Sequence, residues 1–394
     1  MMSDSTIVIV EAVRTPIGSI SGSLSSVKSH ELGTAVIKEL LSRTKLPPSE
    51  VSEVILGQVL TAGAGQNPAR QSAINAGVPL NAPAYIINQL CGSGLKSVML
   101  GYQSIKTGDA NIVICGGQES MSMAPHCILM RKPLKMGNTP LVCTITTDGL
   151  TDAFHSIHMG DTAENIAKQF NISRKEQDLQ AVISQNRAEI AQKQGYFDKE
   201  IVPITVKDRK GDVIVNKDEF PCHGTTYETL ERLRPAFSKD GTVTAGNACG
   251  WNDGAAGVIL MTLDEARKQN LVPKVKILGF GQSGVDPKVM GLGPVHAIKN
   301  LLQKISWSIE DVDLFEINEA FAAQIIAVVR ELGIDNEKVN INGGAIALGH
   351  PMAASGARVL VTLIHALERT GKSKGVAALC IGGGMGIAIA VERI

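Results

Sequence analysis

The sequence predicts an α/β fold made of two similar halves, with a further segment inserted into the first half. Three observations support this prediction. Short, β-branched and largely apolar runs alternate with segments of helical periodicity. A pattern of turn, helix and strand occurs once in each half of the chain. The length of 394 residues is greater than one ordinary hydrophobic core accommodates.

The predicted strands are apolar on both faces, as is typical of strands that helices cover on each side. They comprise residues 7–12, 54–59, 111–115, 257–261, 312–317, 376–381 and 386–391. Three helices are predicted from apolar stripes at three- and four-residue spacing, and the stripes end at Gly108, Gly333 and Gly371. A fourth helix, over residues 173–194, begins with a capping box formed by Ser173 and Glu176.

An internal repeat relates residues 91–117 to residues 349–384. Each stretch contains a turn of small residues, an amphipathic helix, a polar link and a strand that ends in cysteine and glycine. In the second half another strand follows at once, whereas in the first half the matching strand comes only after a long intervening segment. We therefore assign residues 1–118 and 251–270 to one half, residues 119–250 to an inserted loop domain and residues 271–394 to the other half.

Charge and cysteine content argue against several classes of function. The 38 basic and 38 acidic residues cancel, so no overall field attracts nucleic acid or an anionic membrane. The seven cysteines include no CxxC pair, which argues against a disulfide framework or a zinc ribbon and favours a reducing compartment. No apolar run is long enough for a membrane span, and neither end of the sequence resembles a targeting signal. We expect a cytoplasmic protein without a metal site.

Cys91 is the first candidate for chemistry, because it lies in QLCGSGLKSV immediately before a predicted helix. The positive end of the helix dipole and nearby N–H groups favour the thiolate, which is the nucleophilic form. A buried, unreactive cysteine is the commoner situation, but the glycine-rich turn makes the two interpretations about equal. A phosphate-binding loop is less well supported, since the GxxxxGK[ST] spacing is missing.

Three further residues lie at comparable positions. His350, in GGAIALGHPMAASGAR, is the counterpart of Cys91 in the second half, and a histidine beside a cysteine is a known way to activate the thiol. Cys380 ends a strand before GGGMG, where free N–H groups could bind an oxyanion and the thiol could act as an acid or base. Asn318 lies where a strand gives way to a helix, and helix capping is favoured over contact with a substrate.

Together these segments resemble the active-site segments of the thiolase family. QLCGSGLK, NEAFA, GGAIALGHP and CIGGGMG occur in the family's order and spacing, and the resemblance covers essentially the whole chain. It implies a thiolase fold of two pseudo-symmetric α/β halves in five layers with an inserted loop domain. It also implies that Cys91, Asn318, His350 and Cys380 share one site.

The resemblance implies a role for each residue. Cys91 would take an acyl group from a first acyl-CoA, and His350 would activate Cys91. Cys380 would remove an α-proton from a second acetyl-CoA. One oxyanion site would consist of His350 with a water held by Asn318, and the other of the backbone N–H groups of Cys91 and Gly382. The expected reaction is a reversible Claisen condensation of two acetyl-CoA to acetoacetyl-CoA and CoA, without a cofactor.

Substrate-contacting positions follow from the same resemblance. Those matching the narrow acyl pocket of short-chain members are His158, Met159 and Met290, although Met290 could equally fill a core. The positions expected to contact the coenzyme A thioester also include Leu233, Phe237, Cys249, Cys222, Ala320 and Phe321. Family members form dimers, and the short-chain members are often tetramers, so a homo-oligomer is expected. The apolar stretch 121–130 could serve that assembly.

The sequence also departs from the family pattern at four positions. Cys222 stands where an arginine is usual near the nucleotide end of coenzyme A, and Cys249 stands where serine is usual beside the pantetheine. Trp251 replaces a smaller aliphatic residue, and Ala353 replaces a glycine. If residue 353 required a positive φ, alanine there would strain the turn that holds His350. Loss of an arginine contact could weaken binding by about 1.5–3 kcal/mol.

Three other functions are kept as alternatives. One is a thiolase for longer 3-ketoacyl-CoA, against which Met290 and the pair His158–Met159 argue. Another is a ketoacyl-synthase-like condensing enzyme, against which the CIGGG cysteine argues. The third is a non-catalytic thiolase-like acyl-CoA binding protein, for which two reactive thiols would be unnecessary.

Overall fold

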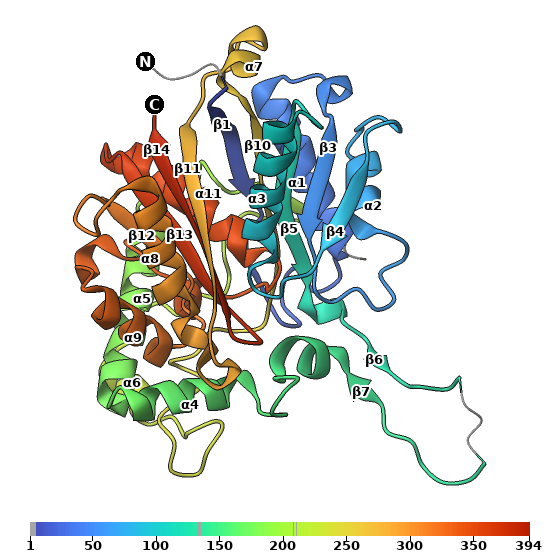
Figure 1. Cartoon of the computed structure of the whole chain (residues 1–394). Helices are drawn as coiled ribbons and strands as arrows, with labels where there is room; N and C mark the ends of the chain where they lie inside the picture. Colours follow the sequence, from blue (N-terminus) through green and yellow to red (C-terminus); the bar gives the residue numbers. More distant parts are fainter. Residues whose placement is uncertain (1–4, 132–134, 208, 210) are drawn as a thin grey trace.

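The computed structural model describes residues 5–131, 135–207, 209 and 211–394. Its main sheet has the strand order β12-β13-β14-β11-β1-β10-β5-β3-β4, and β2 pairs with β10 at the side (Figure 1). The first half contributes β1 (Ile7–Arg14), β2 (Gly18–Ser19), β3 (Glu53–Gly57), β4 (Ala84–Ile87), β5 (Val113–Ser120) and β10 (Asn252–Thr262). The second half contributes β11 (Val275–Gly284), β12 (Leu314–Ile317), β13 (Lys374–Ile381) and β14 (Met385–Arg393).

Strand pairing repeats between the two halves. In the first half β1 pairs with β10, β10 pairs with β5, and β5 runs parallel to β3. In the second half β11 pairs with β14, β14 pairs with β13, and β13 runs parallel to β12. A short antiparallel contact between β1 and β11 joins the halves. The internal repeat that the sequence indicates therefore corresponds to a repeated topology.

Helices separate and cover the two parts of the sheet. The helices of the two halves are α1 (Ser29–Thr44), α2 (Pro68–Asn75), α3 (Ser93–Thr107), α7 (Leu263–Lys268), α8 (Gly293–Ile305), α9 (Ala322–Leu332), α10 (Ala345–Leu348) and α11 (Ser355–Thr370). One core packs α3 and α11 between strands of both halves. A second core packs α1 on the outer face of the first half, and a third packs α8 and α9 on the outer face of the second. These helices and strands form five layers, which confirms the predicted fold class.

The helix ends agree with the sequence analysis. Gly108, Gly333 and Gly371 all adopt positive φ at the ends of α3, α9 and α11. Ser173 accepts a hydrogen bond from the backbone N–H of Glu176, so the predicted capping box is present. Among the long strands of the described residues, β11 is the one that the sequence did not predict, because glycines interrupt its apolar run. At Gly281 a Cβ would lie 2.0 Å from the carbonyl oxygen of Ala297, so α8 packs directly on the strand backbone there.

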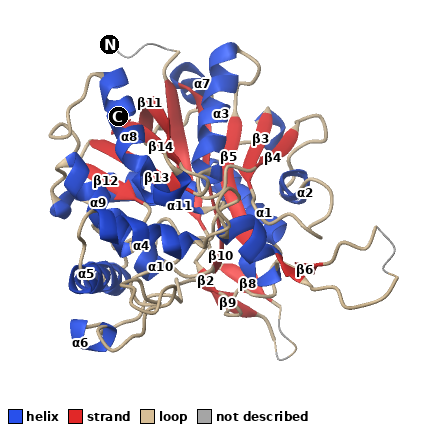
Figure 2. Cartoon of the chain, turned by 60° about the horizontal axis from the view of Figure 1, so that its bottom comes forward, coloured by secondary structure: helices blue, strands red, loops and turns tan. Residues whose placement is uncertain are grey.

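Residues between β5 and β10 form most of one end of the molecule. They contain α4 (Met159–Gln169), α5 (Arg174–Lys193), α6 (Tyr227–Leu230), β8 (Ile204–Val206) and β9 (Val213–Val215) (Figure 2). A narrow arm bearing β6 (His126–Cys127) and β7 (Val142–Cys143) extends away from the body (Figure 1). The division of the chain at residues 118, 250 and 270 stays a prediction. No helix in the described part of the chain is long and apolar enough to cross a membrane.

Candidate active site

Cys91 lies in a tight turn between β4 and α3. Leu90 adopts φ +49°, an unfavourable conformation for a residue with a branched side chain. The hydroxyl of Ser93 holds this turn: it accepts the N–H of Gln89 at 2.9 Å and donates to the carbonyl of Leu90 at 2.6 Å. Gly92 permits close packing, since a Cβ there would lie 2.4 Å from the side chain of Ile381. The turn therefore brings Cys91 against the loop that follows Cys380.

The thiol of Cys91 is neutral at rest. Burial raises its pKa to about 11, and the negative charge of Glu119 acts in the same direction. The nearby backbone amides of Gly382 and of Cys91 itself favour the thiolate and partly oppose this rise in pKa. We expected the helix and nearby amides to favour the thiolate, but burial outweighs them. The thiol therefore needs a proton acceptor.

His350 has the properties of such an acceptor. Burial lowers its pKa to about 4, and the positive charge of buried Arg358 adds to the effect, so the imidazole is neutral near pH 7. Its Nδ1 lies 2.5 Å from the Ser355 hydroxyl, which in turn lies 3.0 Å from the carbonyl of Pro351. If Nδ1 donates to Ser355 and Ser355 donates to Pro351, the lone pair of Nε2 is free. Nε2 is buried and has no hydrogen-bond partner among the described residues.

Backbone contacts hold the histidine turn in place. The N–H of His350 donates to Asn252 at 2.8 Å, and Gly349 at φ +96° passes so close to Asn252 that a Cβ would overlap it. Ala353 does not adopt positive φ, so the strain considered for alanine at this position is absent. Its N–H instead donates to the buried carboxylate of Glu119 at 3.2 Å.

The carboxylate of Glu119 connects parts of both halves. Besides Ala353 it accepts the N–H groups of Val59 at 3.1 Å and Leu60 at 3.2 Å. Burial raises the pKa of Glu119 to about 7 despite these donors, and the nearby charge of Asp253 contributes. The sequence alone did not indicate a role for this residue. The available signal was a single acidic residue at the end of an apolar strand, where burial requires hydrogen-bond partners.

Asn318 does not cap a helix. The following helix, α9, begins at Ala322 with Phe321 as its N-cap. The buried amide nitrogen of Asn318 instead lies 3.5 Å from Nδ1 of His350, and its Oδ1 has no hydrogen-bond partner among the described residues. The helix capping that the local pattern favoured was therefore wrong. Oδ1 of Asn318 and Nε2 of His350 are thus both buried polar atoms without a hydrogen-bond partner among the described residues.

Cys380 ends β13, and the β13–β14 turn follows it directly. Gly383 and Gly384 adopt φ +80° and +81° in this turn, and the backbone amide of Gly382 lies near enough to Cys91 to lower its pKa. Burial raises the pKa of the Cys380 thiol well above its ordinary value. The nearby sulfurs of Cys91 and Cys249 raise it further. Three thiols are thus close enough to influence one another electrostatically.

A cavity with an empty volume of about 390 Å³ opens beside these residues. Its lining includes five predicted site residues, namely His158, Met159, Phe237, Cys249 and Phe321, together with His350. The imidazole of His158 stacks on Phe237 with the ring centroids 4.9 Å apart. Met290 and Ala320 pack in the apolar cluster that contains Cys380. The lining also includes Met121, Leu150, Trp251 and Met352, which sequence analysis did not place at the site.

Two predicted contact residues lie away from this cavity. Cys222 is exposed, and its N–H donates to Gln185 at 2.9 Å. Leu233 is 37% exposed, and its carbonyl accepts a hydrogen bond from Arg174 at 3.0 Å. Neither residue lines the cavity, and their contact with a coenzyme stays a prediction.

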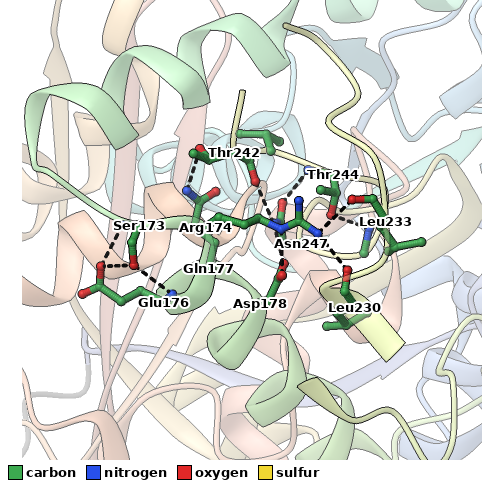
Figure 3. A network of polar contacts seen from close by, with 12 residues as sticks. Ser173, Arg174, Glu176, Gln177, Asp178, Leu230, Leu233, Thr242, Thr244 and Asn247 are labelled. Atoms are coloured by element: carbon green, nitrogen blue, oxygen red, sulfur yellow. Dashed lines mark hydrogen bonds and ion pairs between the residues drawn. The ribbon is translucent and has the colours of Figure 1, made fainter. Parts of the chain in front are cut away.

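A polar network fixes the segment that carries Phe237 and Cys249 (Figure 3). From α5, Arg174 donates to the carbonyls of Leu230 and Leu233 and pairs with Asp178 at 2.7 Å. The amide of Asn247 donates to Asp178 at 2.9 Å and accepts the N–H of Thr244 at 2.8 Å. The carbonyl of Asn247 accepts the N–H of Ala322 at 2.9 Å. This network therefore sets one cavity wall against α9.

Comparisons with known proteins agree over the whole chain. The family model described as "Thiolase, N-terminal domain" matches residues 7–264, and "Thiolase, C-terminal domain" matches residues 271–393. Cytosolic acetyl-CoA acetyltransferase of Mus musculus is 59% identical over 389 residues, which cover 98% of each chain. Acetyl-CoA acetyltransferase of Rhizobium meliloti strain 1021 is 55% identical over 393 residues, covering 100% of both. The crystal structure of Bacillus anthracis acetyl-CoA acetyltransferase superposes with TM-score 0.97 at 45% identity, covering 100% of both chains.

The Asn247 network yields a stability prediction. Asn247→Ala should lower the free energy of unfolding by about 2–4 kcal/mol, because buried Asp178 loses a donor and the Thr244 N–H loses its acceptor. Asn165→Ala is the matched control: among the described residues this exposed asparagine donates to the Lys288 carbonyl at 3.0 Å alone, and its loss should cost less than about 0.5 kcal/mol. Chemical denaturation of both variants checks this. Equal losses would contradict the importance of the network.

A second prediction concerns the dependence of stability on pH. Glu119 keeps its proton up to about pH 7 in the folded protein, whereas the unfolded chain releases it near pH 4–5. The folded state therefore binds more protons in this window, and this contribution to stability falls as pH rises. The free energy of unfolding of the wild type should fall from about pH 5 to pH 7 relative to Glu119→Gln. A difference that stays constant with pH would contradict the raised pKa.

Proposed function

This chain belongs to the thiolase family, and from that premise we propose that it is an acetyl-CoA C-acetyltransferase. It joins two acetyl-CoA to acetoacetyl-CoA and CoA, and it also catalyses the reverse reaction. The observation that carries the proposal is the position of the Cys91 thiol. The Cys91 thiol lies close enough to the backbone amide of Gly382 for that amide to lower its pKa, at a site that includes His350 and a second thiol, Cys380. Relatives named acetyl-CoA acetyltransferase support the choice of substrate.

In the first half-reaction Cys91 becomes acetylated. Nε2 of His350 takes the thiol proton, and the sulfur attacks the thioester carbonyl of acetyl-CoA. The backbone N–H groups of Cys91 and Gly382 hold the resulting oxyanion. When the intermediate collapses, Cys380 gives its proton to the departing CoA thiolate. The enzyme is left with acetyl-Cys91, a protonated His350 and a Cys380 thiolate.

In the second half-reaction the carbon–carbon bond forms. The Cys380 thiolate takes an α-proton from a second acetyl-CoA, and the enolate oxygen is held by protonated His350 and a water on Asn318. The enolate carbon attacks the carbonyl of acetyl-Cys91. Cys91 leaves as a thiolate and recovers its proton from His350, so every group returns to its starting state. N–H donors and the water on Asn318 hold the charges, and we propose that neither metal nor organic cofactor takes part.

The shape of the cavity supports a short acyl group. His158, Met159 and Met290 are held near the thiols by apolar contacts with Phe237 and Phe321. Phe237 and Cys249 on the cavity wall would contact the carrier arm, with Leu233 and Cys222 further out. A broader 3-ketoacyl-CoA thiolase is the main alternative, and a non-catalytic acyl-CoA binder is the second.

Assembly and location are also proposals. The exposed edge of β4, with Tyr85 36% exposed, could pair with a second copy of the chain. The arm exposes Leu129, Met136 and Leu141, which favours burial in a larger homo-oligomer. Dimer and tetramer are both compatible with these surfaces. The mouse and rat relatives are named cytosolic, which supports a cytoplasmic location.

Activity on a series of acyl chain lengths tests the substrate choice. We expect kcat/KM for cleavage by CoA to be at least about 10-fold lower for 3-ketohexanoyl-CoA than for acetoacetyl-CoA, because two extra methylenes do not fit. Similar values for both substrates would favour the broad-range thiolase. Binding of CoA by folded protein without any turnover would favour the binding protein.

Cys380→Ser separates the two half-reactions. Exchange of the acetyl group between acetyl-CoA and free CoA requires acetylation of Cys91 but no carbon–carbon bond, so part of this activity should persist. Formation and cleavage of acetoacetyl-CoA should fall by about 10²–10⁴-fold. Cys127→Ser, a change in the arm, is the matched control and should alter neither activity. Equal loss of both activities in Cys380→Ser would contradict the separate roles of the two cysteines.

A further inference from the structure

Asn318 lies in a buried, irregular turn between β12 and α9. Its side-chain oxygen has no hydrogen-bond partner among the described residues, and its amide nitrogen lies 3.5 Å from Nδ1 of His350. These contacts are too weak to fix the side chain, so its position depends on the turn itself. On one side the N–H of Asn318 donates to the carbonyl of Ala378 at 2.9 Å. On the other side the turn is held by the next residue, Glu319.

The carboxylate of Glu319 is the meeting point of several segments. Glu319 is 1% exposed, and four donors surround its carboxylate. From α5, the Ser184 hydroxyl donates at 2.6 Å and the Gln180 amide at 3.3 Å. The side-chain amide of Asn340 donates at 3.2 Å, and the backbone N–H of Ile346 in α10 donates at 3.3 Å. Three separate segments of the chain thus converge on one side chain.

These hydrogen bonds make the carboxylate of Glu319 rigid. The oxygen of Ser184 already accepts the N–H of Gly344 at 2.9 Å, so its own proton is free for Glu319. Every partner offers a proton, which suits an ionised carboxylate, because that group can only accept. The packing is also close, since a Cβ on Gly344 would lie 2.3 Å from the carboxyl carbon. Movement of Glu319 would leave several buried donors without a partner.

Asn340 extends this support to the strand that precedes Asn318. Its Oδ1 accepts the N–H of Ile317 at 2.8 Å, and its Nδ2 donates to the carbonyl of Ile317 at 2.8 Å as well as to Glu319. The residues immediately before and after Asn318 are therefore tied to the same group of side chains. A change at Glu319 should be transmitted directly to Asn318.

His350 depends less on Glu319, because it has contacts of its own. Its N–H donates to Asn252 at 2.8 Å, and its Nδ1 lies 2.5 Å from the Ser355 hydroxyl. Glu319 reaches this segment only at Ile346, four residues earlier in the chain. Loss of the Glu319 contacts should therefore displace Asn318 more than His350.

We propose that Glu319 is a positioning residue that holds Asn318 where its side chain can carry the water of the enolate oxyanion site. This inference rests on the proposed function. Glu319 is not among the described residues that line the cavity, so it acts through Asn318 and not on the substrate. The first turns of α5 fix one cavity wall (Figure 3). Through Ser184 and Gln180 the same helix also supports the turn that carries Asn318.

Glu319→Gln tests this role by comparing the two half-reactions. The amide keeps the size of the side chain but turns an NH2 group toward some of the donors, so the turn should shift. Formation and cleavage of acetoacetyl-CoA should fall about 10- to 100-fold. Acetyl exchange between acetyl-CoA and CoA forms no enolate and should stay within about threefold of the wild-type rate. Equal loss of both activities, or no loss of either, would overturn the proposal.

A double-mutant cycle with Asn318→Ala shows whether Glu319 acts through Asn318. If it does, the variant with both changes should condense acetyl-CoA within about twofold of the rate of Asn318→Ala alone. Effects that multiply would overturn the proposal. Asp313→Asn is the matched control, because this carboxylate accepts the N–H groups of Ser373 and Lys374 at 3.0 and 2.8 Å at the other end of β12. This change should alter neither activity.

Ser184→Ala provides the test if the Glu319→Gln variant does not fold. It removes one donor from the carboxylate and should lower condensation about 3- to 5-fold, while acetyl exchange stays unchanged. An unchanged ratio of the two activities would overturn the proposal. If the wild type shows neither activity, the proposed function fails and this inference fails with it. An active wild type with the same ratio of activities in Glu319→Gln removes only the role of Glu319.

Discussion

Removal of the reactive side chains from water is the constraint on which the site depends. Burial raises the pKa values of the Cys91 and Cys380 thiols and lowers that of His350, so all three groups are neutral at rest. Isolated charges cost much free energy in a site from which water is excluded. Once a charge develops there, however, each N–H donor stabilises it more strongly than it would in water. We therefore expect charge to arise only during reaction, close to the backbone amide of Gly382.

This constraint explains why the site needs both halves of the molecule. Cys91 comes from a turn of the first half, while His350 and Cys380 come from the second. The carboxylate of Glu119 accepts N–H groups from residues 59 and 60 on one side and from Ala353 on the other. The side chain of Ile381 meets Gly92 so closely that no Cβ fits there. Gly92 and the buried Glu119 thus keep the segments that carry Cys91 and His350 in a fixed relative position.

The sequence predicted the fold, and it supplied the candidate catalytic residues, because both depend on local patterns. Glycines at helix ends, the capping box at Ser173 and the repeat that relates Cys91 to His350 are all visible in a single chain. The sequence did not predict strand β11, because glycines interrupt its apolar pattern. These glycines allow α8 to pack closely on the strand. The sequence also did not predict the roles of Glu119 and Met352 or the protonation state of Cys91. These depend on burial, which arises only when distant segments of the chain pack together. The local pattern around Asn318 favoured helix capping, and only the resemblance to the family placed this residue beside His350.

The central claim is that Cys91, among three neighbouring thiols, carries the acyl group. The most direct test is to incubate the protein with acetyl-CoA, stop the reaction in acid and locate the acetyl group by peptide mass spectrometry. The account predicts a thioester on the peptide that contains Cys91, with Cys249 and Cys380 unmodified. An acetyl group on Cys249 or Cys380, with Cys91 free, would contradict it.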